Sequence, residues 1–514
     1  MSDSKTVCGI DLGTQSCKLV VYEYEKKKII AQSQAPLEII AGNDGTREQK
    51  ADWYNAALKT CFDQIDKKLK NSIAAIGVSG QQHGLVALDD KGKAVYNVKL
   101  WCDTSTAAEC EELTVMAGCE KKLIAVTGLP MRSGYTAGKI QWLKNHRPKV
   151  FAEVRHVLLP HDYINFLLTD NYSAEYGDAS GTALFDVRKR KWSSYVCNLV
   201  SPDLESWLPP LVKPGNAAGF VSKAASGIFG IPEGIPVAAG GGDNMMSAIG
   251  TGAVRDGFLT MSLGTSGTLF GFSEKPVIDP AGNLAAFCSS TGGWLPLLCT
   301  MNCTVASEEF RSLFGFDVKT FDVEAAKAPI GSEGIAVLPF FNGERTPNLP
   351  NGRASINGIN AVNFKRENLA RAALESAIFG MRTGLESFNS LRFQAREIRL
   401  TGGGSKSPLW QSIAANVMNL PVRIPAVSEA AAMGAAIQAL WCLRNAACNN
   451  KAAQAKATKS AATAQKVSIE FLADEHVALE GGVTIKPEKK AVQAYNKAYE
   501  NYVRYLRALS PLYK

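Results

Sequence analysis

Apolar positions in the first forty residues fall into short runs that are separated by turn residues. Residues 7–12 (VCGIDL) form one apolar run, a Gly-Thr turn follows, and residues 18–24 return as a second apolar run. Further strand-like runs lie at 73–78 and 85–88, and residues 52–69 have helical spacing. Strands that alternate with helices are typical of an α/β fold. The pattern therefore predicts an α/β chain that begins with a β-meander.

The same order of elements occurs again near the middle of the chain. Residues 8–23 (CGIDLGTQSCKLVVYE) and 259–274 (LTMSLGTSGTLFGFSE) both read as an apolar strand, a Leu-Gly-Thr turn and a second apolar strand. A repeat about 250 residues after the first is what a duplicated domain predicts. We therefore expect two domains, residues 1–250 and 251–443, with their boundary near 245–255, followed by an extension over 444–514.

The C-terminal third contains three recognisable patterns. Residues 397–410 read as a strand that enters a Gly-rich turn and then a helix, and the Ala-rich residues 430–443 predict another helix. Residues 444–465 are rich in Ala, Lys and Asn and predict an exposed helix or a loop. Steps of three and four residues then predict an amphipathic helix that packs on the body through Val492, Tyr495, Tyr499, Tyr502, Leu506 and Leu509.

Composition narrows the class of protein. The chain has 514 residues, of which 46% are hydrophobic and 20% charged, so a globular fold is expected. The net charge of +8 is not concentrated in a dense basic run with interleaved aromatics, so we expect no nucleic-acid partner. No apolar stretch is long enough to cross a bilayer and no export signal is recognisable, so we expect no membrane association.

The number and spacing of the cysteines indicate the redox state of the compartment. The 12 cysteines are scattered, without a CxxC motif or a Cys/His pair at zinc spacing. This usage is typical of free thiols in a reducing environment, and we expect a soluble, cytoplasmic protein.

No standard nucleotide-binding motif is present. The sequence has no P-loop, and no Rossmann glycine pattern follows a strand. The Leu-Gly-Thr turns offer another cradle, because small residues let backbone N–H groups approach an anion. Asp11, at the end of the first strand, is suited to hold a hydrated Mg²⁺ ion. The alternative is an ordinary hairpin turn, since Asp, Gly and Thr are all common turn residues.

Other polar residues follow predicted strands, where ligands of open α/β sheets bind. Asp243 follows three glycines and is either a proton acceptor for a substrate hydroxyl or a helix N-cap. Gln82 and His83 suit hydrogen bonds to a polyol, although His is also a common structural residue. Asp103 lies beside Trp101, a pairing found at sugars. The glycines 402–404 suit either a flat nucleoside or a tight turn.

Several segments together carry a resemblance to a known family. IDLGT, SGQQHG, AGGGDN, SLGTSG, GERTP and TGGGSKS, in this order, resemble the FGGY carbohydrate kinases of the actin-like ATPase superfamily. Residues 134–146 (GYTAGKIQWLKNH) resemble the first signature of the family, and residues 358–375 resemble the second. The resemblance extends over roughly residues 6–440. Residues 100–106 (LWCDTST) depart from it, since many bacterial members read WNDGR there.

The resemblance implies a fold, an activity and a set of site residues. The fold would be two actin-like (ribonuclease H-like) ATPase domains around a deep cleft. The cofactors would be ATP and Mg²⁺. SGQQHG, GGDN and GERTP resemble members that phosphorylate D-xylulose on its terminal hydroxyl. Asp243 would be the general base and Asp11 would hold hydrated Mg²⁺. The sugar would be bound by Gln82, His83, Asp103, Asp243 and Asn244. ATP would be bound by Thr14, Gln15, Gly264, Thr265, Gly402, Gly403 and Ser407.

Two alternatives stay open at this stage. Another sugar or polyol kinase of the same family would act on ribulose, gluconate or glycerol. A non-kinase actin-like ATPase would use the same two phosphate turns, but it would need neither SGQQHG nor Asp243. A homodimer is expected only because two-fold symmetric dimers are the commonest oligomers of soluble proteins.

Overall fold

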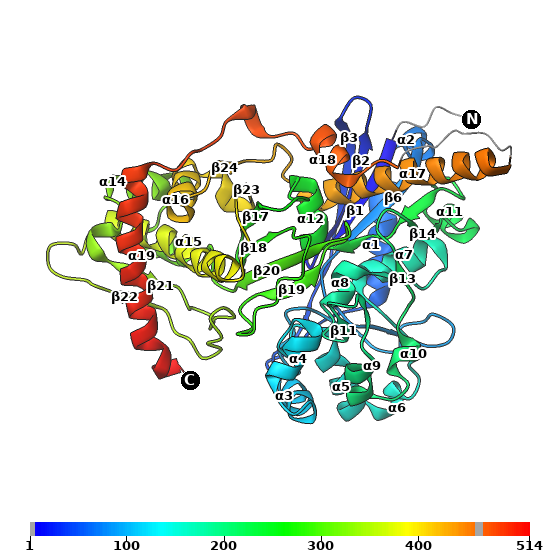
Figure 1. Cartoon of the computed structure of the whole chain (residues 1–514), viewed down its shortest axis with the longest axis horizontal. Helices are drawn as coiled ribbons and strands as arrows, with labels where there is room; N and C mark the ends of the chain where they lie inside the picture. Colours follow the sequence, from blue (N-terminus) through cyan, green and yellow to red (C-terminus); the bar gives the residue numbers. More distant parts are fainter. Residues whose placement is uncertain (1–5, 458–465, 514) are drawn as a thin grey trace. The chain divides into compact units, whose positions relative to one another are not determined.

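The computed structural model of the chain describes residues 6–457 and 466–513 (Figure 1). The chain forms two compact units. Unit 1 comprises Met1–Val254, Glu274–Leu295 and Glu429–Val477, and unit 2 comprises Arg255–Ser273, Pro296–Ser428 and Ala478–Lys514. Each unit is thus assembled from separate stretches of the chain. The α/β class expected from the sequence is confirmed.

Unit 1 is built on a mixed sheet with the order β14-β15-β6-β1-β2-β3, to which β16 adds by pairing with β6. Strand β1 is antiparallel to β2 and parallel to β6, and β16 is also parallel to β6. The main strands are β1 (Thr6–Leu12), β2 (Ser16–Glu23), β3 (Lys28–Pro36), β6 (Ile73–Gly80), β14 (Ala217–Phe220), β15 (Pro236–Ala238) and β16 (Gly241–Gly242). The predicted opening meander is confirmed as β1-β2-β3.

The remaining strands of unit 1 are short. They are β4 (Ile40–Ala41), β5 (Arg47–Gln49), β7 (Val86–Leu88), β8 (Val98–Lys99), β9 (His156–Leu158), β10 (Ala174–Glu175), β11 (Phe185–Asp186), β12 (Lys191–Trp192), β13 (Leu211–Val212) and β19 (Ala285–Cys288).

The helices of unit 1 are α1 (Ala51–Asp63), α2 (Lys67–Asn71), α3 (Ala107–Met116), α4 (Glu120–Thr127), α5 (Thr136–His146), α6 (Pro148–Phe151), α7 (Pro160–Thr169), α8 (Tyr176–Ser180), α9 (Ser194–Val200), α10 (Leu204–Trp207), α11 (Lys223–Phe229), α12 (Asp243–Thr251), α17 (Ala430–Ala457) and α18 (Ile469–His476). The single helix predicted over residues 52–69 is two helices, because Asp66 caps α2 by accepting a hydrogen bond from the backbone N–H of Lys68.

Helix α17 packs on β1 and β6 and against α12, and Figure 1 shows it running along this sheet. The approach is so close that only glycine fits on the facing surfaces. A Cβ atom on Gly9 or Gly77 would meet the backbone of α17, and a Cβ on Gly434 would meet the carbonyl oxygen of Met246 in α12. The predicted Ala-rich helix is confirmed and continues to residue 457, while residues 458–465 of the predicted Ala/Lys-rich segment lie outside the described residues.

Unit 2 repeats the opening pattern of unit 1. Strand β17 is antiparallel to β18 and parallel to β23, as β1 is to β2 and β6. Its strands are β17 (Phe258–Leu263), β18 (Gly267–Gly271), β20 (Trp294–Thr300), β21 (Ala336–Leu338), β22 (Ser355–Asn357), β23 (Glu397–Thr401) and β24 (Val422–Arg423). Its helices are α13 (Val305–Phe314), α14 (Val318–Lys327), α15 (Arg366–Ser390), α16 (Pro408–Met418) and α19 (Lys489–Leu509).

The predicted terminal helix is confirmed as α19, which packs within unit 2. Its buried residues include Tyr495, Tyr499 and Tyr502, three of the six positions expected from the spacing. The hydroxyl of Tyr495 accepts a hydrogen bond from Arg371 of α15 over 2.7 Å, and Tyr499 donates to Glu386 over 3.0 Å. The tyrosine rings thus bury apolar area while their hydroxyls keep partners.

Two further observations concern the described residues as a whole. Their cysteines, from Cys8 to Cys442, are all free thiols. None of the helices that the structure describes is long and apolar enough to cross a membrane.

Candidate active site

Three strand ends meet on the sheet of unit 1. Asp11 pairs in register with Ser79 of the parallel strand β6, and Gly242 of β16 pairs with Gly80 of the same strand. Because parallel strands end at the same edge, residues that follow these strands are brought together. The group comprises Asp11, Gln82, His83 and Asp243, all predicted from the sequence.

Asp243, Asn244 and Gln82 form one hydrogen-bonded set. The side-chain amide of Asn244 donates to Oε1 of Gln82 over 2.6 Å and to Oδ1 of Asp243 over 3.0 Å. The same carboxylate oxygen accepts from the backbone N–H of Asn244 over 2.8 Å. Gly242 permits this arrangement, since a Cβ there would lie 2.6 Å from Cγ of Gln82.

The Asp243 carboxyl lies at the start of α12 and does not cap it. The N-cap residue is Gly242, and no side chain caps the helix. Burial, together with the nearby carboxylates of Asp11 and Asp178, raises the pKa of Asp243 to about 7 against the lowering effect of its hydrogen bonds. A carboxyl with this pKa exchanges protons near neutral pH, as a general base must.

His83 is held on several sides. Its backbone lies in the left-handed region with φ of 63°, and its carbonyl oxygen accepts from Lys139 over 2.6 Å and from Thr136 over 3.0 Å. Nδ1 lies 3.1 Å from Oδ1 of Asp178, and the rings of Tyr135 and Phe287 pack with centroids 5.3 Å from the imidazole. This packing places His83 rigidly beside the Gln82 end of the group.

Asp178 is a site residue that sequence reasoning missed. It lies in the short helix α8, 95 positions from His83, and no motif marks it. Lys139 lies within the segment 134–146 that resembles the first family signature, and the sequence gives it no role. Burial lowers the pKa of its amine to about 7, although the carboxylate of Asp103 acts to raise it. The carboxylate of Asp178 and the amine of Lys139 both contact His83 from distant positions in the chain. Such contacts depend on the tertiary fold and cannot be predicted from local sequence.

Asp11 and the turn after it lie at the same edge. Asp11 is half-buried and accepts from the hydroxyl of Ser79 over 2.8 Å; burial raises its pKa. In the turn, Thr14 donates its hydroxyl to Gln81 over 3.1 Å and accepts from Trp101 over 2.9 Å, while Gln15 is exposed.

The structure does not bring Asp103 into the group. Its side chain is fully buried, and Oδ2 accepts from Lys99 over 3.0 Å and from the backbone N–H of Arg47 over 2.8 Å. Oδ1 accepts from the backbone and hydroxyl of Ser105 over 3.0 and 2.6 Å. With four donors on one carboxylate, the contacts favour a supporting role for Asp103, and its assignment to a sugar stays a prediction.

The predicted phosphate and nucleoside residues of unit 2 also cluster. Gly264 and Thr265 form the turn between β17 and β18, and Gly402 follows β23, the parallel neighbour of β17. Gly402 has φ of 86°, and a Cβ there would lie 2.6 Å from the carbonyl oxygen of Leu263. Gly403 follows in open space, and Ser407 caps α16 by accepting from the backbone N–H of Trp410.

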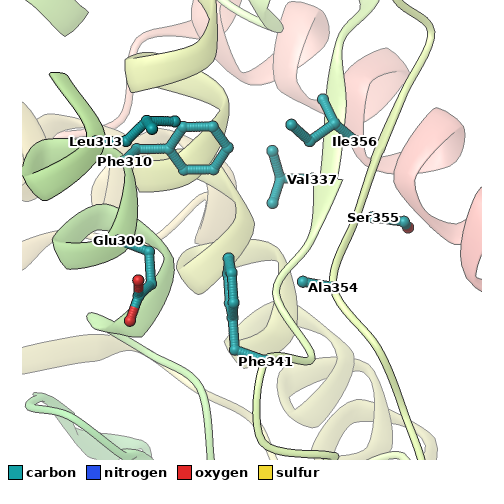
Figure 2. Close-up of a pocket in the computed structure, with 8 residues that line it drawn as sticks. All are labelled: Glu309, Phe310, Leu313, Val337, Phe341, Ala354, Ser355 and Ile356. Atoms are coloured by element: carbon teal, nitrogen blue, oxygen red, sulfur yellow. The ribbon is translucent and has the colours of Figure 1, made fainter.

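Two other features of unit 2 differ from this cluster. Glu344 of the GERTP segment is buried and accepts from the backbone N–H of Met301 over 2.7 Å and from Asn302 over 3.1 Å. The loop therefore folds back and uses this carboxylate internally. An apolar pocket of about 360 Å³ contains none of the predicted site residues (Figure 2), and its lining comprises Glu309, Phe310, Leu313, Val337, Phe341, Ala354, Ser355 and Ile356.

The donor set at the edge of unit 1 suits a hydrated magnesium ion. Among residues 6–457 and 466–513, no group of three or more His, Cys, Asp or Glu side chains is placed to hold a metal. Mg²⁺ keeps several waters and is typically held by one or two carboxylates together with phosphates. Asp11 offers one carboxylate beside a Gly-Thr turn, which fits this requirement, and its role toward Mg²⁺ stays a prediction.

Comparisons with known proteins match both halves of the chain to one family. Residues 6–250 match the N-terminal domain of the FGGY family of carbohydrate kinases, and residues 259–443 match its C-terminal domain. The xylulose kinase of Haemophilus influenzae is 42% identical over 98% of this chain and 99% of its own length.

Solved structures share the fold over nearly the whole chain. The crystal structure of a xyloylose kinase from Brucella ovis has a TM-score of 0.87 at 28% identity, covering 99% of this chain and 100% of its own. A gluconate kinase from Lactobacillus acidophilus reaches the same TM-score of 0.87 at 21% identity, covering 99% of each chain, and shows the fold alone. With both of its domains matched, the chain belongs to the FGGY family of carbohydrate kinases and has their two-domain, actin-like fold.

Proposed function

We propose that this carbohydrate kinase transfers the γ-phosphoryl group of ATP to the terminal hydroxyl of D-xylulose, giving D-xylulose 5-phosphate. The observation that carries the proposal is the set formed by Gln82, Asn244 and Asp243, in which an amide pair lies beside a carboxyl with a pKa of about 7. The choice of sugar is supported by the relative from Haemophilus influenzae, which is named a xylulose kinase.

Asp243 is the general base of the proposed reaction. Its carboxylate accepts the proton of the attacking hydroxyl as the new O–P bond forms and the bond to the β-phosphate oxygen breaks. The raised pKa of about 7 matches the base to neutral pH, where such proton transfer is most efficient. Asn244 fixes the orientation of the carboxylate through Oδ1, which leaves Oδ2 for the proton.

The sugar is held by polar groups around Asp243. Gln82, His83 and Asn244 supply amide and imidazole groups that hydrogen-bond hydroxyls, as a polyol site requires. Asp103 would support the sugar site indirectly, by accepting hydrogen bonds from Lys99 and from the backbone N–H of Arg47. We assign residues 1–250 as the sugar-binding domain, 251–443 as the nucleotide-binding domain, and 444–514 as an extension whose terminal helix packs on the body.

ATP is assigned to the two Leu-Gly-Thr turns and the glycine turn after β23. Thr14, Gln15, Gly264 and Thr265 would face the phosphates, and the nucleoside would be held by Gly402, Gly403 and Ser407. Asp11 would hold hydrated Mg²⁺, which spreads the charge of the phosphates when it is bound. Closure around the substrates would exclude water as a competing acceptor.

The test is ADP release in a coupled assay with MgATP and a panel of D-xylulose, D-ribulose, L-ribulose, D-fructose, glycerol and gluconate. We expect the highest kcat/KM with D-xylulose. If another acceptor gives the highest value, the sugar is wrong and the kinase activity stands. If ADP release does not depend on any acceptor, the actin-like ATPase alternative replaces the proposal. The homodimer and the cytoplasmic location stay predictions.

A further inference from the structure

Asp178 is a carboxylate shared by two histidines in the interior of unit 1. Its Oδ1 lies 3.1 Å from Nδ1 of His83 and its Oδ2 lies 3.2 Å from Nδ1 of His161. All three side chains are buried, and Asp178 and His161 have no exposed surface. The backbone N–H of His83 also points at Asp178, over 3.3 Å. One carboxylate therefore contacts both the ring and the backbone of His83.

His161 supplies the positive charge that this arrangement needs. Its Nε2 lies 2.9 Å from Oδ1 of Asp162, so both of its ring nitrogens face carboxylates. An imidazole between two carboxylates carries a proton on each nitrogen. Although burial alone would raise it, hydrogen bonds from His161 and His83 lower the pKa of Asp178 to about 2. Asp178 is thus an anion that accepts a hydrogen bond from Nδ1 of His161 and has its other oxygen 3.1 Å from Nδ1 of His83.

Steric contacts keep the ring of His83 in this orientation. A Cβ atom on Gly181 would meet the imidazole, so only glycine lets the ring lie where it does. Tyr135 and Phe287 pack against the ring, with centroids 5.3 Å away. A ring flip would turn carbon Cδ2 toward Asp178 and lose the contact to Nδ1. The orientation and the position of the proton are therefore set together.

We propose that Asp178 is a positioning residue of the sugar site, which holds the His83 proton on Nδ1 so that Nε2 accepts a hydrogen bond from a sugar hydroxyl. The proposal deepens the proposed function and rests on it for the identity of the ligand. The chemical consequence is selectivity. An acceptor nitrogen binds a hydroxyl, which can donate, and disfavours a carbonyl or a carboxylate at the same position. His161 is the counter-charge that keeps Asp178 ionised.

The first measurement is the tautomer of His83 in the whole protein. In ¹⁵N-histidine-labelled wild-type enzyme above pH 7.5, the ring nitrogens of His83, assigned through a His83→Gln sample, should report a protonated Nδ1 and an unprotonated Nε2. The tautomer is measured without sugar or nucleotide, so it does not depend on activity. A protonated Nε2 with an unprotonated Nδ1 would overturn the proposal even if the enzyme phosphorylates D-xylulose.

The second measurement is steady-state kinetics of Asp178→Asn, with the acceptor that wild-type enzyme uses best. We expect KM for the sugar to rise at least about tenfold, the effect of losing one hydrogen bond to a charged group, while KM for ATP stays within about twofold. His161→Gln, which removes the charge but keeps a donor toward Asp178, should give a smaller rise in the same KM. If Asp178→Asn does not fold, His161→Gln carries this measurement.

Glu109→Gln is the matched control, because Glu109 is another buried carboxylate of unit 1 that contacts a histidine, His146, over 2.8 Å. The control should leave both KM values near wild type. Equal rises in KM for sugar and ATP, or the same rise in the control, would overturn the proposal. A wild-type enzyme without acceptor-dependent activity would overturn the proposed function instead, and the tautomer would still decide the arrangement of His83.

Discussion

Asn244 donates a side-chain hydrogen bond to Oε1 of Gln82 over 2.6 Å, although 162 positions separate the two residues. The bond joins the segment after β6 to the first turn of α12. The same amide also donates to Asp243, so the amide of Gln82 and the proposed base are aligned by one group. A sugar hydroxyl that binds at Gln82 is thereby placed close to the carboxylate that would accept its proton.

Asp243→Asn should lower kcat at least about a hundredfold, because the amide cannot accept the hydroxyl proton and general bases contribute about 10²–10⁴ in rate. KM for ATP should change little. The coupled ADP-release assay measures both values. Asp63→Asn, a change at an exposed carboxylate of α1 that pairs with Lys59, is the control and should retain wild-type kcat. Near-normal kcat in folded Asp243→Asn would remove Asp243 from the role of base.

The pH dependence of the activity should report the same carboxyl. The base works only when it is unprotonated, so kcat/KM for the sugar should rise with pH up to about 7, the raised pKa of Asp243, and level off above it. Initial rates between pH 5 and 9 at low sugar concentration measure this profile. The residual activity of Asp243→Asn should lack that inflection; a variant with the same inflection would assign it to another group.

The contribution of Asp243 to the free energy of unfolding should fall as pH rises, whereas the activity should increase. Burial raises its folded pKa to about 7, above an unfolded value of about 3.9, so between these values the folded protein binds the extra proton. The contribution of Asp243 to stability is present below about pH 4 and is lost as pH rises through about 7. Urea unfolding of wild type and Asp243→Asn at several pH values should show their difference in unfolding free energy changing over this window, and a constant difference would contradict the shift.

Gly402→Ala should raise KM for ATP and leave sugar binding unchanged. The new Cβ would lie 2.6 Å from the carbonyl oxygen of Leu263, and the φ of Gly402 is 86°. The change would push the turn after β23 away from the turn between β17 and β18, both of which are assigned to the nucleotide. The matched control is Gly315→Ala, where φ is 67° but nothing lies within 4 Å of the new Cβ. Equal effects of the two changes on KM for ATP would mean that backbone strain, not the clash with Leu263, is responsible.

Gly434→Ala should destabilise unit 1 by about 1–3 kcal/mol, the usual cost of overpacking, because its Cβ would meet the backbone of Met246 where α17 crosses α12. Gly227→Ala in α11 is the control. No atom lies within 4 Å of that Cβ, and the helical position should gain about 0.4–1 kcal/mol. Thermal unfolding of both variants checks the pair, and a similar shift in both would exclude close helix packing as the cause.

Much of the candidate site was predictable because short motifs carry it. The two Leu-Gly-Thr turns, Asp243 and the SGQQHG segment all follow strands, and strand ends gather at one edge of a sheet. Asp178 and His161 were not predictable, because their role depends on being buried beside His83 rather than on any local spacing. The four internal donors on Asp103 were hidden for the same reason, since Arg47 and Lys99 reach it from separate elements.

Element types were also easier to predict than their associations. The tyrosine spacing identified α19, and the apolar run identified α17. Nothing in the local pattern around Glu429 indicates that the chain returns there to the sheet of β1 and β6. A contact between residues more than 400 positions apart is set by tertiary packing, and local periodicity carries no information about it.

The return of α17 to the first sheet has a consequence for protein synthesis. A ribosome that has made the first 300 residues holds β1 and β6 without the helix that packs on them, because Ala430–Ala457 has not yet been translated. Domains usually fold as the chain emerges, from the N-terminus onward. Here the earliest strands must wait for the last fifth of the chain, so a nascent chain has to keep an apolar sheet face from aggregating until translation is nearly complete.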